Sequence, residues 1–109
     1  MPNIRLFDAH CHLEDPAFDE DRWEVVDRAL KAGLIGIVSS ALDSSDAEKA
    51  LRLFLPSRVV HVSLGLDPRD ADNPEEVRAV EKLILANEKN IVAVGEVGLD
   101  YRIAKQESL

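Results

Sequence analysis

Two histidines one residue apart form the part of this chain best suited to chemistry. They lie in Asp8-Ala9-His10-Cys11-His12-Leu13, directly after the apolar run of residues 4–7. Side chains two positions apart on a strand share a face, so His10 and His12 can direct two imidazoles at one metal ion. Imidazole suits zinc, and neighbouring carboxylates extend the choice to manganese or magnesium. The competing interpretation is a pair of partly exposed loop histidines with no ligand role.

Two neighbours of these histidines invite secondary roles. Asp8 has the same strand parity as the histidines, and we expect it to hold one imidazole in place. Cys11 is the single cysteine of the sequence, so no intrachain disulfide is possible. It should point to the opposite face of the strand, where we interpret it as a small buried packing residue in preference to a thiol ligand or nucleophile.

Composition and charge indicate one globular domain over residues 1–109 and restrict its partners. The 109 residues are 46% hydrophobic and 31% charged, which is enough for a single core. A formal net charge of −8 argues against a basic nucleic-acid-binding surface, so a phosphate substrate would need metal ions to offset its charge. No apolar run is long enough to cross a membrane, and residues 1–5 lack the apolar region of a signal peptide, which predicts a cytoplasmic protein.

Strands and helices are expected to alternate along the chain. Four apolar runs predict strands, over residues 4–8, 34–38, 59–64 and 91–95. Three segments with apolar residues at helical spacing predict helices, one over 19–32, one opening at Ser45 and one opening at Asn73. Helical crossovers between hydrophobic strands imply a parallel sheet with right-handed connections, and therefore an α/β fold.

Capping residues predict where two of these helices begin. Ser45 and Glu48 have the spacing of a capping box, and Pro56 lies just beyond the end of that helix. Asn73 is followed by Pro74 and two acidic residues, the pattern of a helix N-terminus.

Polar residues follow the predicted strands, at the edge where parallel α/β folds place their chemistry. Glu96 directly follows the fourth strand, so it should lie at the same edge as His10 and His12 and could bind one metal ion or bridge two. A salt-bridged acid is the alternative for Glu96. Asp67 follows the third strand at this edge. His61 lies within that strand, where we interpret it as a packing histidine.

Three of these strand-end segments together resemble the signatures of TatD-like metal-dependent hydrolases. They are Asp8-Ala9-His10-Cys11-His12-Leu13, Gly65-Leu66-Asp67-Pro68 and Gly95-Glu96-Val97-Gly98-Leu99-Asp100-Tyr101. The resemblance implies an amidohydrolase-type TIM barrel, of which four strands and three helices would form about half. It implies that the two histidines bind a first divalent metal ion and that the glutamate binds and bridges to a second, with zinc, magnesium or manganese as candidates. Hydrolysis of a phosphodiester such as DNA by a metal-activated water would follow.

Two departures from the family pattern shape this expectation. Asp67 stands where the family usually has histidine, so it could bind metal or serve catalysis, reflect an altered pocket, or be a turn residue before Pro68. The sequence also has no counterpart of the later strands, which in the family add two histidines and an aspartate to the metal site. We therefore expect self-association or a missing C-terminal half to complete the barrel. The alternative functions are an amidohydrolase-like reaction at another bond and a non-catalytic remnant.

Overall fold

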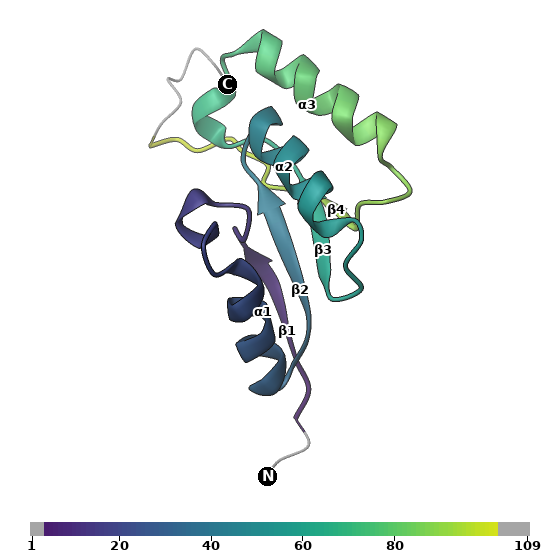
Figure 1. Cartoon of the computed structure of the whole chain (residues 1–109). Coiled ribbons are helices and arrows are strands. Elements are labelled where there is room, and N and C mark those ends of the chain that lie inside the picture. Colours follow the sequence, from purple (N-terminus) through teal and green to yellow (C-terminus); the bar gives the residue numbers. More distant parts are fainter. Residues whose placement is uncertain (1–3, 103–109) are drawn as a thin grey trace.

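The computed structural model describes residues 4–102, with strands and helices alternating along the chain (Figure 1). The strands are β1 (Leu6–Cys11), β2 (Leu34–Ala41), β3 (Val60–Leu64) and β4 (Ala93–Val94). The α-helices are α1 (Arg22–Lys31), α2 (Ser44–Phe54) and α3 (Pro74–Ala86). Two short 3-10 helices, Pro16–Phe18 and Pro68–Asp70, follow β1 and β3.

The four strands form one parallel sheet in the order β1-β2-β3-β4. Each crossover between neighbouring strands contains a helix, which is the repeat from which a (β/α)8 barrel is built. The α/β class, the parallel sheet and the half-barrel architecture predicted from the sequence are therefore confirmed. In the described part of the chain, β1 and β4 are the two edges of the sheet.

Several element boundaries differ from those predicted. β1 begins at Leu6 and continues to Cys11, so the strand itself carries His10. β2 extends to Ala41. β4 is reduced to two residues, because only Ala93 and Val94 pair with β3.

The capping residue predicted for α2 was wrong, whereas that for α3 was right. Asp43, in extended conformation, accepts a hydrogen bond from the backbone N–H of Asp46 at 2.8 Å and caps α2. Ser45 lies inside the first turn, where its backbone is helical and cannot fill the capping position. At α3, Asn73 accepts from the backbone N–H of Glu76 at 3.2 Å. α1 begins at Arg22, three residues later than predicted.

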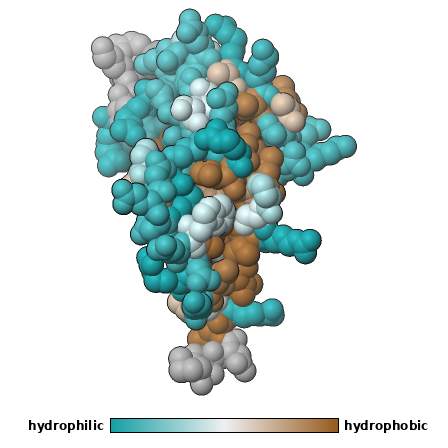
Figure 2. Space-filling view, in the orientation of Figure 1, coloured by the Kyte–Doolittle hydropathy of each residue, from teal (hydrophilic) through white to brown (hydrophobic). Residues whose placement is uncertain are grey.

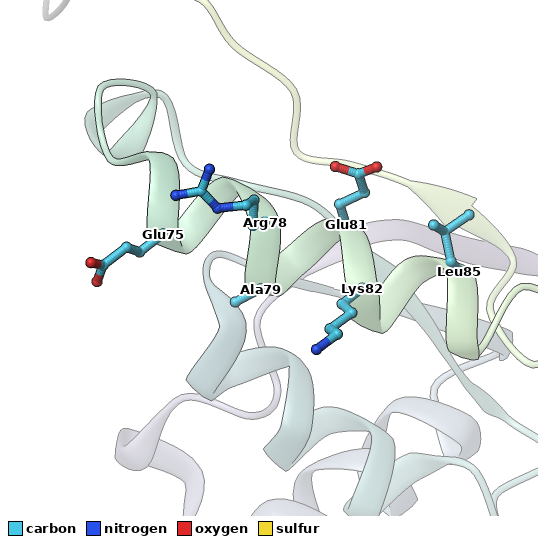
Figure 3. Close-up of a pocket in the computed structure, with 6 residues that line it drawn as sticks. All are labelled: Glu75, Arg78, Ala79, Glu81, Lys82 and Leu85. Atoms are coloured by element: carbon cyan, nitrogen blue, oxygen red, sulfur yellow. The ribbon is translucent and has the colours of Figure 1, made fainter.

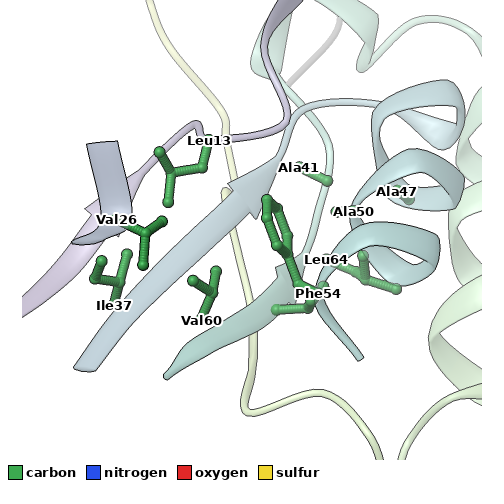
Figure 4. Packing of buried hydrophobic residues seen from close by; sticks show 10 residues of the cluster. Leu13, Val26, Ile37, Ala41, Ala47, Ala50, Phe54, Val60 and Leu64 are labelled. Carbon is green, nitrogen blue, oxygen red and sulfur yellow. The ribbon is translucent and has the colours of Figure 1, made fainter. Parts of the chain in front are cut away.

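The core lies between the sheet and the helices that cover one of its faces (Figure 4). Phe54 of α2 is 1% exposed and meets the Trp23 ring of α1 edge to face, with ring centroids 5.8 Å apart. Alternate residues of β3 face this core, as expected for a strand with helices on one side. The buried apolar residues of the cluster are Leu13, Val26, Ile37, Ala41, Ala47, Ala50, Phe54, Val60, Val62 and Leu64.

Apolar side chains also remain exposed along the strands. Phe7 is about half exposed and stacks on His61, with ring centroids 6.2 Å apart and an interplanar angle of 14°. His61 therefore has a packing contact, in agreement with its interpretation from the sequence. Val92, just before β4, and Val94, within it, are each more than half exposed. Figure 2 shows several patches of exposed hydrophobic residues between hydrophilic surfaces on the face it presents.

Candidate metal centre

The structure brings His10, His12 and Glu96 together, as the predicted strand ends required. Their potential ligand atoms all lie within 4.8 Å of one another. The Nε2 atoms of His10 and His12 lie 3.1 and 3.4 Å from the same carboxylate oxygen, Oε2 of Glu96. The two imidazoles are nearly perpendicular, with ring centroids 5.0 Å apart. Residues 86 positions apart in sequence therefore converge on one point.

The end of β1 is irregular just before this group. Asp8 pairs with Ile37 and Cys11 with Ser39, so three steps on β1 oppose two on β2. This is the pattern of a β-bulge, which redirects the side chains that follow it. The Asp8 carboxylate accepts a hydrogen bond from the backbone N–H of His10 at 3.0 Å. Asp8 thus fixes the bulged backbone, whereas the sequence had suggested that it would hold an imidazole.

Ser40, at the end of β2, holds both imidazoles. Its carbonyl oxygen lies 2.7 Å from Nδ1 of His12, so this Nδ1 carries the proton and Nε2 keeps its lone pair for a ligand. Its hydroxyl lies 3.3 Å from Nδ1 of His10. Ser40 was not among the residues predicted from the sequence, although its position just after the predicted buried strand over residues 34–38 was a signal that could have found it. Both Nε2 atoms are consequently left facing Glu96.

The chemistry of the three donors fits a divalent transition metal. Two imidazole nitrogens and one carboxylate oxygen are common zinc ligands, and ligand atoms about 2.0 Å from a tetrahedral ion lie roughly 3.3 Å apart. The two nitrogen-to-oxygen distances, 3.1 and 3.4 Å, match that spacing, and all three ligand atoms lie within 4.8 Å of one another. The His10 side chain is 53% exposed and that of Glu96 29%, so one side of the group is open to solvent. The same atoms also form the His–Glu ion pair that the sequence offered as an alternative.

A buried polar network supports the backbone immediately after His12. Glu14 is 1% exposed, and its carboxylate accepts a hydrogen bond from the Ser39 hydroxyl. Burial raises the pKa of Glu14. The Ser39 hydroxyl also accepts from the backbone N–H of Leu13 at 2.9 Å. The buried guanidinium of Arg22 donates to the carbonyl of Leu13 at 2.5 Å and to that of Asp15 at 3.2 Å. The Ser39 bonds attach the segment after β1 to β2, and the Arg22 bonds attach it to α1. No sequence pattern had indicated them.

Cys11 lies between the two histidines but has the environment of a packing residue. Its thiol is partly buried against the core and donates to the carbonyl of Val38 at 3.4 Å. Burial, with the nearby Asp8 charge, raises the pKa of Cys11 to about 11. A thiol with this pKa stays protonated at neutral pH and is a poor nucleophile.

Asp67 lies at the same edge of the sheet but is not part of the group of three ligands. Its side chain is 13% exposed, and its backbone N–H donates to the carbonyl of Leu42 at 2.9 Å. The carboxylate accepts hydrogen bonds from the backbone and side chain of Arg69, which hold the pKa of Asp67 below its usual value. The structure therefore engages this carboxylate in a turn.

Two surface cavities differ in their relation to these residues. One of about 640 Å³ is lined by residues of α3 alone, with no member of the metal group in its wall (Figure 3). A second, of about 250 Å³, has Asp67, Glu96 and Leu99 in its wall. The second cavity joins the candidate ligand Glu96 to the loops after β3 and β4.

Comparison with known proteins decides the family. Residues 7–109 match the family described as TatD related DNase. The chain belongs to this family. It is 37% identical over 103 residues to a metal-dependent hydrolase of Methanocaldococcus jannaschii, covering 94% of this chain and 41% of that protein. It is 34% identical over 107 residues to the human deoxyribonuclease TATDN3, covering 90% of this chain and 39% of that protein.

The fold has a counterpart among solved structures of this family. The crystal structure of a TatD-family hydrolase from Entamoeba histolytica superposes with a TM-score of 0.80 at 22% sequence identity. The match covers 95% of this chain and 42% of that one. The chain thus spans about two fifths of the length of these relatives. No helix in the described residues is long and apolar enough to cross a membrane.

Proposed function

We propose that this chain carries the first metal-binding part of a metal-dependent hydrolase that cleaves phosphodiester bonds in DNA. The observation that carries the proposal is the convergence of two imidazole Nε2 atoms on one Glu96 oxygen at 3.1 and 3.4 Å. Family membership and a relative named a deoxyribonuclease support the choice of DNA as substrate.

Each residue of the group has a defined task in this proposal. His10 and His12 hold a first divalent ion through Nε2, and Glu96 contributes a carboxylate oxygen with a second oxygen free to reach another ion. Zinc, manganese and magnesium are the candidates for these two sites. When bound, such ions lower the pKa of a water and polarise a phosphoryl oxygen. Ser40 keeps both imidazoles oriented, and the open side of the group admits the substrate.

We further propose that additional strands complete the barrel, supplied by a second copy or by a C-terminal half. The edge strands β1 and β4 carry exposed apolar side chains, with Leu6 54% and Val94 57% exposed. Unpaired edges with apolar side chains favour association. Size-exclusion chromatography of the purified chain should show a dimer or larger species. A sharp monomer with cooperative melting would contradict this part of the proposal.

A nuclease assay with magnesium, manganese or zinc tests the proposed activity. The substitution pair His10→Ala/His12→Ala should abolish both hydrolysis and metal binding. His61→Ala is the matched control, because this histidine packs against Phe7 outside the metal group. Hydrolysis that survives the double substitution would remove these histidines from the mechanism. No bound metal at millimolar concentrations would favour the non-catalytic alternative.

A further inference from the structure

The loops after β3 and β4 contain the same local device, an aspartate that binds the arginine two residues later. In the first loop, Asp67 accepts hydrogen bonds from Arg69 through the backbone N–H at 2.8 Å, Nε at 3.0 Å and Nη2 at 2.9 Å. In the second, Asp100 accepts from Arg102 through the corresponding atoms at 2.9, 3.2 and 2.9 Å. We name these pairs the β3 clamp (Asp67 and Arg69) and the β4 clamp (Asp100 and Arg102).

The two clamps lie next to each other and next to the metal group. The two loops are in contact at Gly98 and Pro68, the residue between Asp67 and Arg69. A Cβ atom added to Gly98 would lie only 2.9 Å from the Pro68 side chain. The backbone N–H of Leu66 donates to the carbonyl of Glu96 at 2.9 Å, which connects the first loop to a candidate ligand. Asp67 and Glu96 share the wall of the cavity of about 250 Å³.

Each clamp is oriented with its carboxylate inward and its guanidinium outward. The side chains of Asp67 and Asp100 are 13% and 22% exposed, whereas those of Arg69 and Arg102 are 69% and 89% exposed. The hydrogen bonds from the arginines hold the pKa values of both aspartates below their usual range, so both carboxylates stay ionised. An arginine fixed in this way loses little further side-chain freedom when it binds a ligand.

The arginines retain donors for a second, anionic partner. A guanidinium has five N–H donors, and the bonds from Nε and Nη2 to the aspartate engage two of them. The remaining donors lie on the outer side of the planar group, the geometry that favours bidentate recognition of phosphate. Exposed ion pairs of this kind contribute little to folding stability.

We propose that the β3 and β4 clamps bind phosphates of the DNA backbone beside the metal group. This inference rests on the proposed function, since it assigns the contacts that would hold the strand for hydrolysis. Arg69 and Arg102 are the binding residues, and Asp67 and Asp100 are positioning residues that act through them. On a chain with a net charge of −8, two fixed guanidinium groups give a local site for phosphate without a broad basic surface.

The test measures the affinity of the whole chain for a fluorescently labelled oligothymidylate. Fluorescence anisotropy reports binding, in EDTA and at a series of salt concentrations. EDTA prevents hydrolysis and removes any contribution from bound metal. Arg69→Ala and Arg102→Ala should each weaken binding about tenfold, as expected for one lost charge-assisted hydrogen-bonding contact. Each should also reduce the slope of log affinity against log salt by about 0.7, because one phosphate contact is lost. Arg69→Lys should keep the slope and lose affinity, since lysine keeps the charge without the planar fork.

Arg52→Ala provides the matched control, because Arg52 is an exposed arginine on α2 and belongs to neither clamp. It should change neither affinity nor slope. The inference is overturned if the double variant Arg69→Ala/Arg102→Ala binds like the parent, if the parent binds no oligothymidylate at low salt, or if polyglutamate, which has no phosphate, competes equally well.

The two proposals fail in distinguishable ways. His10→Ala/His12→Ala removes the metal ligands and should leave binding in EDTA unchanged if the clamps bind phosphate on their own. Calorimetric titration with zinc should in turn give the same affinity for the parent and for the clamp variants. A parent chain that binds oligothymidylate but no zinc would refute the metal site alone, and a parent chain that binds zinc but no oligothymidylate would refute the clamps alone.

Discussion

Removing the Ser40 hydroxyl should weaken metal binding without removing any metal ligand. Ser40 is 2% exposed and contacts both imidazoles, through its carbonyl to His12 at 2.7 Å and through its hydroxyl to His10 at 3.3 Å. Ser40→Ala deletes the second contact and leaves the first, because the carbonyl belongs to the backbone. The His10 ring then loses the bond that directs its Nε2 atom toward Glu96.

The size of this effect follows from the geometry. Removal of a group that orients a metal ligand typically costs ten- to a hundredfold in metal affinity. The hydroxyl contact of 3.3 Å is long, and the His10 side chain is 53% exposed, so its rotation is only partly restrained by packing. We therefore expect the lower end of the range, about tenfold or about 1.4 kcal/mol of binding free energy.

Isothermal titration with zinc, accompanied by thermal melting, measures this effect. Ser57→Ala is the matched control, because its hydroxyl accepts hydrogen bonds from the backbone N–H groups of Val59 and Val60 at the opposite end of the sheet. It should change the melting temperature and leave zinc affinity unchanged. Parental zinc affinity in folded Ser40→Ala would refute the idea that this hydroxyl orients His10.

Two further predictions concern the stability of the fold. The pKa of Asp19 lies below its usual value because Arg22 and Lys49 donate hydrogen bonds to its carboxylate. Asp19→Asn should therefore lower the urea midpoint of unfolding at neutral pH. The difference in midpoint between this variant and the parent should vanish as pH falls through the lowered pKa of Asp19. A difference in midpoint that does not depend on pH would contradict this. Phe54→Ala, at a site 1% exposed, should cost about 3–5 kcal/mol in urea unfolding, whereas Leu85→Ala, at a site 64% exposed, should stay within about 0.5 kcal/mol. Equal losses of unfolding free energy in Phe54→Ala and Leu85→Ala would contradict the position assigned to the core.

The fold was predictable because its signals are local and strong. Runs such as Leu34–Val38 identify a buried strand without reference to the rest of the chain, and Asn73-Pro74 identifies a helix start by its own chemistry. Boundaries were less predictable because they depend on pairing partners. β4 was predicted over 91–95, but only two of these residues pair with β3. The cap of α2 falls on Asp43 because the chain there is extended after β2, which the local Ser-x-x-Glu pattern could not reveal.

The candidate ligands were predictable, whereas the groups that support them were not. His10, His12 and Glu96 are marked by residue type and by their place at strand ends. Ser40 contributes through a backbone carbonyl and a hydroxyl that depend on strand register. Glu14 stands beside another acid, Asp15, and its buried partner Ser39 becomes clear only when β1 and β2 are adjacent. Sequence patterns show which atoms could bind, but contacts between distant segments determine what orients them.

The most direct test of the metal site observes the imidazole nitrogens themselves. Long-range ¹H–¹⁵N NMR of the histidine side chains, recorded during titration with zinc, reports which ring nitrogen is protonated and which is bound. The proposed site predicts that Nε2 of both His10 and His12 shifts to the position of a metal ligand while Nδ1 of His12 stays protonated against Ser40. His61 should remain unchanged and serves as the internal reference. Ring nitrogens of His10 and His12 that do not respond at millimolar zinc would contradict the metal site.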